Sequence, residues 1–175
     1  MQLFYKKKQN HIISKIFSKL ISTDFKSFLR KVFLQLNPAA KFYDNWHIDL
    51  IINYLLAIEA GKLNRLIINM PPRSLKSVSI NVAWSAWLLG QNPACRIISI
   101  SYSKALSQKH ANDTRIIMNS EWYQNAFPST KILDGCNTHS KFMTTQNGFR
   151  MACSTCGTLT GEGGDIIDLL HNHIN

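Results

Sequence analysis

With 175 residues, of which 45% are hydrophobic and 10% aromatic, the chain is long enough for one domain, short for two, and too apolar to be disordered. Its formal net charge is +10, and the first 31 residues hold eight lysine and arginine residues against Asp24 alone. The body is therefore close to neutral, and the basic N-terminal arm favours an anionic partner such as nucleic acid or a membrane surface.

Two helices are predicted in this arm. Apolar residues recur every three or four positions over residues 12–21, with Lys15 and Lys19 on the other side. Thr23 or Asp24 can cap a second helix. Two alternatives stay open: the helices pack on the domain that follows, or they form a basic amphipathic arm that lies on DNA or lipid.

Neither a transmembrane segment nor a secretion signal is expected. The apolar stretch at residues 50–58 is interrupted by Asn53 and is too short to span a bilayer. The apolar residues of the arm are interrupted by lysines, and no small-residue cleavage site follows them. We therefore expect the four cysteines to be free thiols in a reducing compartment.

The next segments have the order strand, loop, helix. Two helices are predicted over residues 46–60 and 78–89, each followed by a glycine that is expected to end it. Between them, the apolar run at 66–69 is typical of a buried strand and leads directly into a loop at 70–77.

A second strand and a hairpin are predicted further along the chain. Residues 96–101 alternate as a strand, and 103–120 follow as a helix. A hairpin is expected from 142–144 and 149–152 around Asn147-Gly148, a strong turn signal. The order of elements indicates an α/β domain over residues 38–175, preceded by the basic helical arm 1–37.

The loop at 70–77 is a candidate phosphate loop. Lys76-Ser77 supplies the lysine for phosphates and the hydroxyl for Mg²⁺ at the start of a helix. Met70 and Leu75 stand where the motif G-x-x-x-x-G-K-[ST] has glycine, and Leu75 would be strained at a positive φ. From the motif alone, a turn with a solvated lysine is an equal alternative.

The segment Pro71-Pro72-Arg73-Ser74-Leu75-Lys76-Ser77 resembles the deviant Walker A loop, Pro-Pro-Arg-x-x-Lys-Ser, of bacteriophage terminase large subunits. The resemblance extends over residues 38–168 and concerns the N-terminal ATPase region of that family. The other segments that carry it are 45–47, 65–70, 83–93, 98–103 and 158–165.

The resemblance implies an incomplete P-loop NTPase-type parallel sheet with flanking helices, with ATP and Mg²⁺ as cofactors. Lys76 would contact the β- and γ-phosphates, Ser77 would hold Mg²⁺, and Arg73 would lie near the γ-phosphate. Ser74 and Leu75 would complete the nucleotide-binding loop. Trp46 and His47 would lie on the adenine side, with a buried core tryptophan as the alternative.

The family implies a role in packaging viral DNA into capsids. The expected partners are double-stranded DNA, a small terminase subunit and a portal. The expected place is the cytoplasm of a bacterial host that carries the gene as prophage.

The sequence departs from the pattern of the family at the expected Walker B strand. Asp168 is the Walker B remnant, only two apolar residues separate it from Asp165, and Leu169 stands where a second carboxylate is expected. The coupling motif and the nuclease carboxylates would lie downstream. We therefore expect ATP binding without motor-like hydrolysis, no nuclease activity, and an exposed apolar sheet edge that lowers solubility.

Two other functions remain as alternatives. A non-catalytic remnant would bind DNA or another subunit through Lys6, Lys7 and Lys8. A zinc-supported nucleic-acid module is the less favoured alternative. Its ligands would be Cys136, His139, Cys153 and Cys156.

The histidines and two of the tryptophans have plainer interpretations. No spacing links a histidine to a nucleophile, so surface positions are expected for His110, His139, His171 and His173. Trp84 and Trp87, three residues apart, are expected to be core contacts of the helix after the loop.

Overall fold

Two helices begin the chain, as the spacing of the apolar residues predicts. Helix α1 spans Gln2–Thr23 and helix α2 spans Phe25–Leu36. Asp24 caps α2, because its carboxylate accepts a hydrogen bond from the Ser27 amide at 2.9 Å. The computed structural model describes residues 2–71, 73–135, 138–155 and 161–170, with side chains from residue 12 onward.

The second helical region is one long helix with a change of winding. It begins at Lys76 and continues through the π-helix η1, Val78–Trp84, into α4, Ser85–Gln91. The expectation that Gly90 ends the helix is wrong, because Gly90 lies inside α4. A Cβ at this position would come within 2.8 Å of the Phe127 ring, so the glycine permits close packing.

The remaining elements follow the predicted order. Helix α3 spans Trp46–Glu59, and the other helices are α5, Lys104–Met118, and α6, Glu121–Ala126. The four strands are β1, Arg96–Ser101; β2, Lys141–Met143; β3, Phe149–Ser154; and β4, Ile166–Leu170.

The sheet has the strand order β2-β3-β1-β4. Strand β1 is parallel to both β3 and β4, and β2 is antiparallel to β3. The predicted hairpin is confirmed, with Asn147 at φ 66° in its turn. Gly148 is needed there because a Cβ would lie 2.1 Å from the carbonyl oxygen of Pro93.

The predicted strand at residues 66–69 is wrong. This segment has no regular secondary structure, and the Ile67 side chain is 86% exposed. Both edges of β1 are already occupied by β3 and β4, so the central strand offers no position for it. The protein is mixed α/β, with a four-stranded mixed sheet and flanking helices. The more specific P-loop NTPase-type sheet that the resemblance implies stays a prediction.

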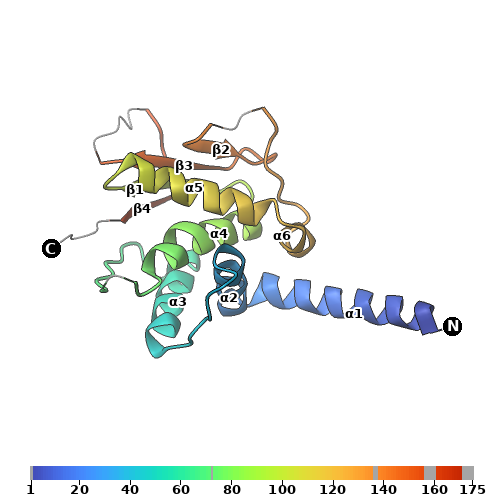
Figure 1. Cartoon of the computed structure of the whole chain (residues 1–175). Coiled ribbons are helices and arrows are strands. Elements are labelled where there is room, and N and C mark those ends of the chain that lie inside the picture. The colour runs from blue at the N-terminus through green and yellow to red at the C-terminus, as the bar shows by residue number, and fades with distance from the viewer. Residues whose placement is uncertain (1, 72, 136–137, 156–160, 171–175) are drawn as a thin grey trace.

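The core lies between the sheet and the helices, which gather on one side of it (Figure 1). Phe28 of α2 packs against Trp87 of α4 and Tyr123 of α6, with ring centroids 5.4 and 6.1 Å apart. Trp84 and Trp87 are each 3% exposed, which confirms that they are core contacts. Helix α2 is therefore joined to the body of the protein, whereas most of α1 projects from it (Figure 1).

The opposite side of the sheet is open at β4. Ile167 and Leu169 are each 63% exposed, while Asp168 and Leu170, on the alternate face, are buried beneath the helices. The expectation of exposed apolar residues on an edge strand is confirmed at this position.

Candidate functional site

The loop before the long helix has an unusual backbone. Arg73 and Leu75 adopt φ angles of 64° and 63°, in the left-handed region that favours glycine. The loop is held by the Ser74 hydroxyl, which donates to the Pro71 carbonyl at 2.7 Å, and by the first helical bond, from the Ser79 amide to the Leu75 carbonyl at 2.9 Å. Leu75 therefore takes, at a steric cost, the conformation that the second motif glycine takes freely.

Lys76 and Ser77 form the first turn of the helix, as the motif requires. Both side chains are half-buried. No carboxylate of the described residues forms an ion pair with Lys76, whose ammonium group thus remains available to an anion. Free amide groups and the positive end of the helix dipole at this terminus favour negative charge.

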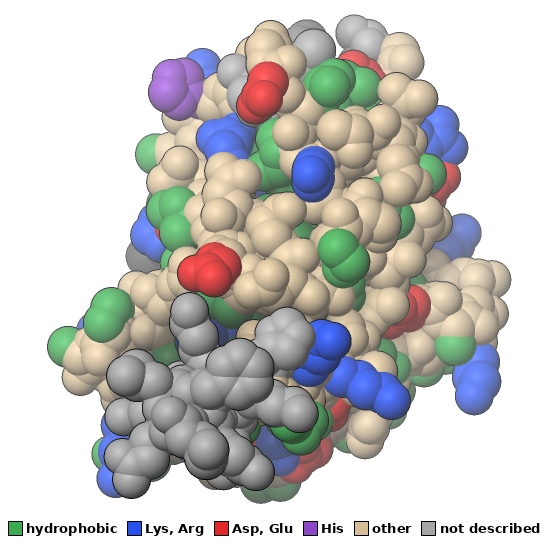
Figure 2. All heavy atoms as spheres, turned by 90° about the vertical axis from the view of Figure 1, so that its right-hand side faces the viewer, with side chains coloured by type: hydrophobic (Ala, Val, Ile, Leu, Met, Phe, Trp, Pro, Cys, Tyr) green, Lys and Arg blue, Asp and Glu red, His purple; other side chains and the backbone are tan. Residues whose placement is uncertain are grey.

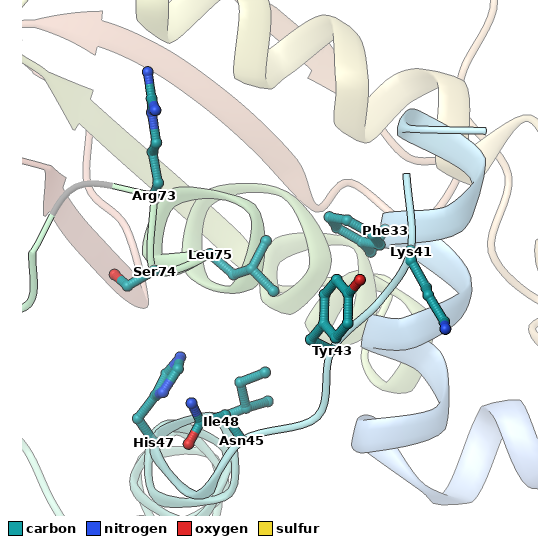
Figure 3. A pocket seen from close by; sticks show the side chains of 9 residues that line it. All are labelled: Phe33, Lys41, Tyr43, Asn45, His47, Ile48, Arg73, Ser74 and Leu75. Carbon is teal, nitrogen blue, oxygen red and sulfur yellow. The ribbon is translucent and has the colours of Figure 1, made fainter. Parts of the chain in front are cut away.

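A pocket of ≈ 320 Å³ adjoins the loop (Figure 3). Tyr43, His47 and Leu75 lie around the same space, while the Arg73 guanidinium points away from it (Figure 3). The pocket thus brings His47 together with part of the predicted nucleotide loop. Its lining consists of Phe33, Lys41, Tyr43, Asn45, His47, Ile48, Arg73, Ser74 and Leu75.

Trp46 stands apart from this pocket. It is 73% exposed at the start of α3, and Lys76 and Ser77 are likewise outside the pocket lining. The alternative that Trp46 is a buried core residue is therefore wrong. Its indole ring contacts the neighbouring imidazole of His47 edge-on, with centroids 6.2 Å apart.

Asp168 is buried beneath the π-helix. Its two oxygens accept hydrogen bonds from the Asn81 amide at 2.5 Å and the Ser99 hydroxyl at 2.7 Å. Burial raises the pKa of this carboxyl to about 6, against the opposing effects of the Arg150 charge and the Ser99 bond. The side chain thus ties β4 to β1 and to η1, the helix that follows the loop.

Arg150 also contacts Asn81. Its guanidinium donates to the Asn81 carbonyl at 3.0 Å and is fully buried. Burial lowers the pKa of Arg150 to about 10, so it stays charged at neutral pH. One helical residue, Asn81, therefore connects a buried cation on β3 with a buried carboxylate on β4.

The prediction that His110 is at the surface is wrong. It is 4% exposed on α5, and burial lowers its pKa to about 4, assisted by the positive charges of Arg150 and Lys109. His139 is exposed as expected. The other two predicted surface histidines, at 171 and 173, lie outside the described residues.

Asp165 and Asp168, the two acidic residues of the segment 165–168, have different surroundings. Asp165 forms an ion pair with Arg96 at 2.7 Å at the surface, and the hydrogen bonds from Arg96 lower the pKa of its carboxyl. Its contacts close the turn into β4, so Asp165 has a structural role.

The structure describes only two of the four proposed zinc ligands, His139 and Cys153. Cys136 and Cys156 lie outside the described residues, as do Pro72 of the loop and residues 158–160 of the segment 158–165 that carries part of the resemblance. Within the described ranges, no three His, Cys, Asp or Glu side chains are grouped as metal ligands would be. None of the described helices is long and apolar enough to cross a bilayer.

Sequence reasoning missed two features of the site. Asn81 and Arg150 organise the buried polar network, and Tyr43 lines the pocket. The available signal was a polar residue inside an apolar segment, as Asn81 is between Ile80 and Val82. Tyr43 lies in an irregular segment without such a signal.

Comparison of the chain with protein families, curated proteins and solved structures finds no match.

Proposed function

We propose that the chain binds the phosphates of ATP, with Mg²⁺, at the loop of residues 70–77. In this proposal the chain is similar to the ATPase region of phage terminase large subunits and acts in the cytoplasm of a bacterial host. The family's role in DNA packaging, with double-stranded DNA, a small subunit and a portal as partners, belongs to the same proposal.

The observation that carries the proposal is the backbone at Leu75. A leucine at φ 63° is strained, and such strain persists where the surrounding structure maintains it, often at binding sites. Leu75 is the residue that replaces the motif glycine, and Lys76 follows it at the helix terminus. Lys76 and the free helix amides fit a phosphate group, because both present donors to an anion.

Fewer residues are available to hold Mg²⁺ than to bind the phosphates. Ser77 would hold Mg²⁺ that arrives with the nucleotide, and Mg²⁺ neutralises phosphate charge. Both Asp168 oxygens already accept hydrogen bonds from protein groups, so this carboxylate does not serve the metal without losing them. This supports binding without motor-like hydrolysis.

The test is thermal unfolding with and without Mg-ATP. At a nucleotide concentration about 100 times the dissociation constant, we expect about 2.7 kcal/mol of added stability, which corresponds to a Tm rise of roughly 5–10 °C. The rise should disappear in Lys76→Ala and should lose its Mg²⁺ dependence in Ser77→Ala.

The matched control is Lys104→Ala, because Lys104 is an exposed lysine in the first turn of another helix, α5. It should retain the full rise. If the wild type melts cooperatively and Mg-ATP leaves its Tm unchanged, nucleotide binding is excluded and a non-catalytic DNA- or subunit-binding remnant takes its place. Mg²⁺-dependent turnover that Lys76→Ala abolishes would instead overturn the absence of hydrolysis.

A further inference from the structure

Helix α1 carries a stripe of exposed apolar side chains. Because residues four positions apart share a helix face, these side chains form a continuous surface along the helix. Ile13 and Ile16 are the most exposed, at 63% and 64%. The stripe consists of Ile12, Ile13, Ile16, Phe17 and Leu20.

The body of the protein covers only the end of this surface. Ile21, next to the stripe, is 1% exposed within the core, and the Lys31 ammonium lies 5.8 Å from the Phe17 ring. Toward its N-terminus the helix runs away from the body (Figure 1). Five apolar side chains on one projecting helix exceed the scattered single apolar residues of an ordinary surface.

The charge on this helix has one sign. The sequence of α1 contains five lysines and no acidic residue. Lys15 and Lys19 flank the stripe, and Ser14 and Ser18 complete the polar side. On the face of the body in Figure 2, by contrast, basic and acidic side chains are interspersed. The helix therefore combines a basic border with an apolar stripe.

Three kinds of surface could meet such a helix. DNA provides phosphates for the lysines but leaves the stripe in water. A second copy of α1 covers the stripe but adds lysines to lysines without any acidic partner. An anionic lipid surface satisfies both, because apolar side chains enter the acyl boundary while lysines stay with the headgroups.

We propose that α1 is a membrane-surface helix that binds anionic phospholipid, with the stripe inserted and Lys15 and Lys19 at the headgroups. The helix lies along the interface. This interaction does not involve the phosphate loop, so it holds or fails independently of nucleotide binding.

The test is flotation of the full chain with vesicles. One preparation is phosphatidylcholine alone, and the other is an equimolar mixture with phosphatidylserine. We expect binding to the mixture that weakens with added salt, and little binding to phosphatidylcholine. Ile13→Asn combined with Ile16→Asn should lower the affinity by about 100-fold or more, and Lys15→Gln combined with Lys19→Gln roughly 30-fold.

Matched controls test whether the loss of vesicle binding is specific to the isoleucines and lysines of α1. Ile116→Asn removes an exposed isoleucine of α5, and Lys104→Gln with Lys131→Gln removes two exposed lysines elsewhere. Both should bind vesicles as the wild type does, and circular dichroism verifies that each variant is folded. Because the substituted isoleucines are exposed, folding should survive.

Several results would overturn the proposal. One is the absence of binding to the anionic vesicles, and another is binding that the two isoleucine substitutions leave unchanged. Binding to double-stranded DNA that depends on Lys15 and Lys19 but not on Ile13 and Ile16, without vesicle binding, would assign the helix to nucleic acid. A concentration-dependent dimer that Ile13→Asn with Ile16→Asn dissociates, again without vesicle binding, would assign the stripe to a second copy.

Discussion

Residues 65–70 and 96–101 have similar sequences but different structures. The first reads Arg-Leu-Ile-Ile-Asn-Met and the second Arg-Ile-Ile-Ser-Ile-Ser. The second is the strand β1, paired on both edges, with Ile97 only 1% exposed. The first is irregular, with Ile67 86% exposed. An apolar run is therefore not enough to make a strand, because a strand also has to be placed against a partner, and residues 65–70 pair with none of the four strands.

The largest expected effect is a difference in the free energy of unfolding when isoleucine is replaced by alanine in each of the two segments. Ile97→Ala should lower the free energy of unfolding by about 2–5 kcal/mol, because it leaves a cavity in the core. Ile67→Ala should change it by less than about 0.5 kcal/mol, because the side chain is already in water. Urea unfolding followed by circular dichroism measures both. Equal losses would mean that residues 66–69 are packed as a strand after all.

The next effect concerns the bond between Asp168 and Ser99, which joins β4 to β1. The pKa of Asp168 is about 6 in the folded protein, above the ordinary value of 3.8 for this side chain, so the folded state holds the proton more tightly. Stability should therefore fall as the pH rises from 4 to 6, by roughly 2 kcal/mol from this group.

His110 acts in the opposite direction over nearly the same range. Its pKa is about 4 when folded against 6.5 unfolded, so its contribution to stability rises with pH by roughly 3 kcal/mol. In the wild type the contributions of these two groups oppose each other between pH 4 and 6.5. Asp168→Asn should become more stable as the pH rises, and His110→Gln less stable.

Urea titrations at several pH values would measure these slopes. Glu121→Gln, at an exposed position in α6, is the control and should follow the wild type. Two variants with the same slope would show that the buried groups do not titrate as their surroundings imply.

The smallest expected effect concerns Arg73, in the loop that follows the irregular segment at residues 65–70. Arg73 is exposed and has a φ of 64°, so Arg73→Gly should be about 1 kcal/mol more stable than Arg73→Ala. The comparison position is Asn147, at φ 66° in the hairpin turn. There, replacement by glycine should matter less, because asparagine tolerates this conformation. No difference between the two Arg73 variants would mean that the loop relaxes to a negative φ.

The local signals in the sequence were sufficient for much of the fold. The cap at Asp24, the helices around residues 46–60 and 103–120, and the hairpin at Asn147-Gly148 were all predicted and are present. These features depend on residues within a few positions of one another, so a linear pattern contains the information.

The sequence also placed Lys76 and Ser77 at the start of a helix and His47 among the site residues. It did not predict that Arg73 and Leu75 share a pocket with Tyr43, nor that Asp168 is held by Asn81 and Ser99. Asn81 and Asp168 are 87 positions apart, and only the packing of η1 on the sheet brings them together.

Taken by itself, the sequence determined where most helices and turns form, that the arm is basic, and which loop is the candidate for binding phosphate. The tertiary structure alone decided that residues 66–69 do not pair, that Gly90 continues a helix, and that His110 is buried. The physical reason is common to all three: strand pairing, close packing and desolvation depend on neighbours that are distant in the chain.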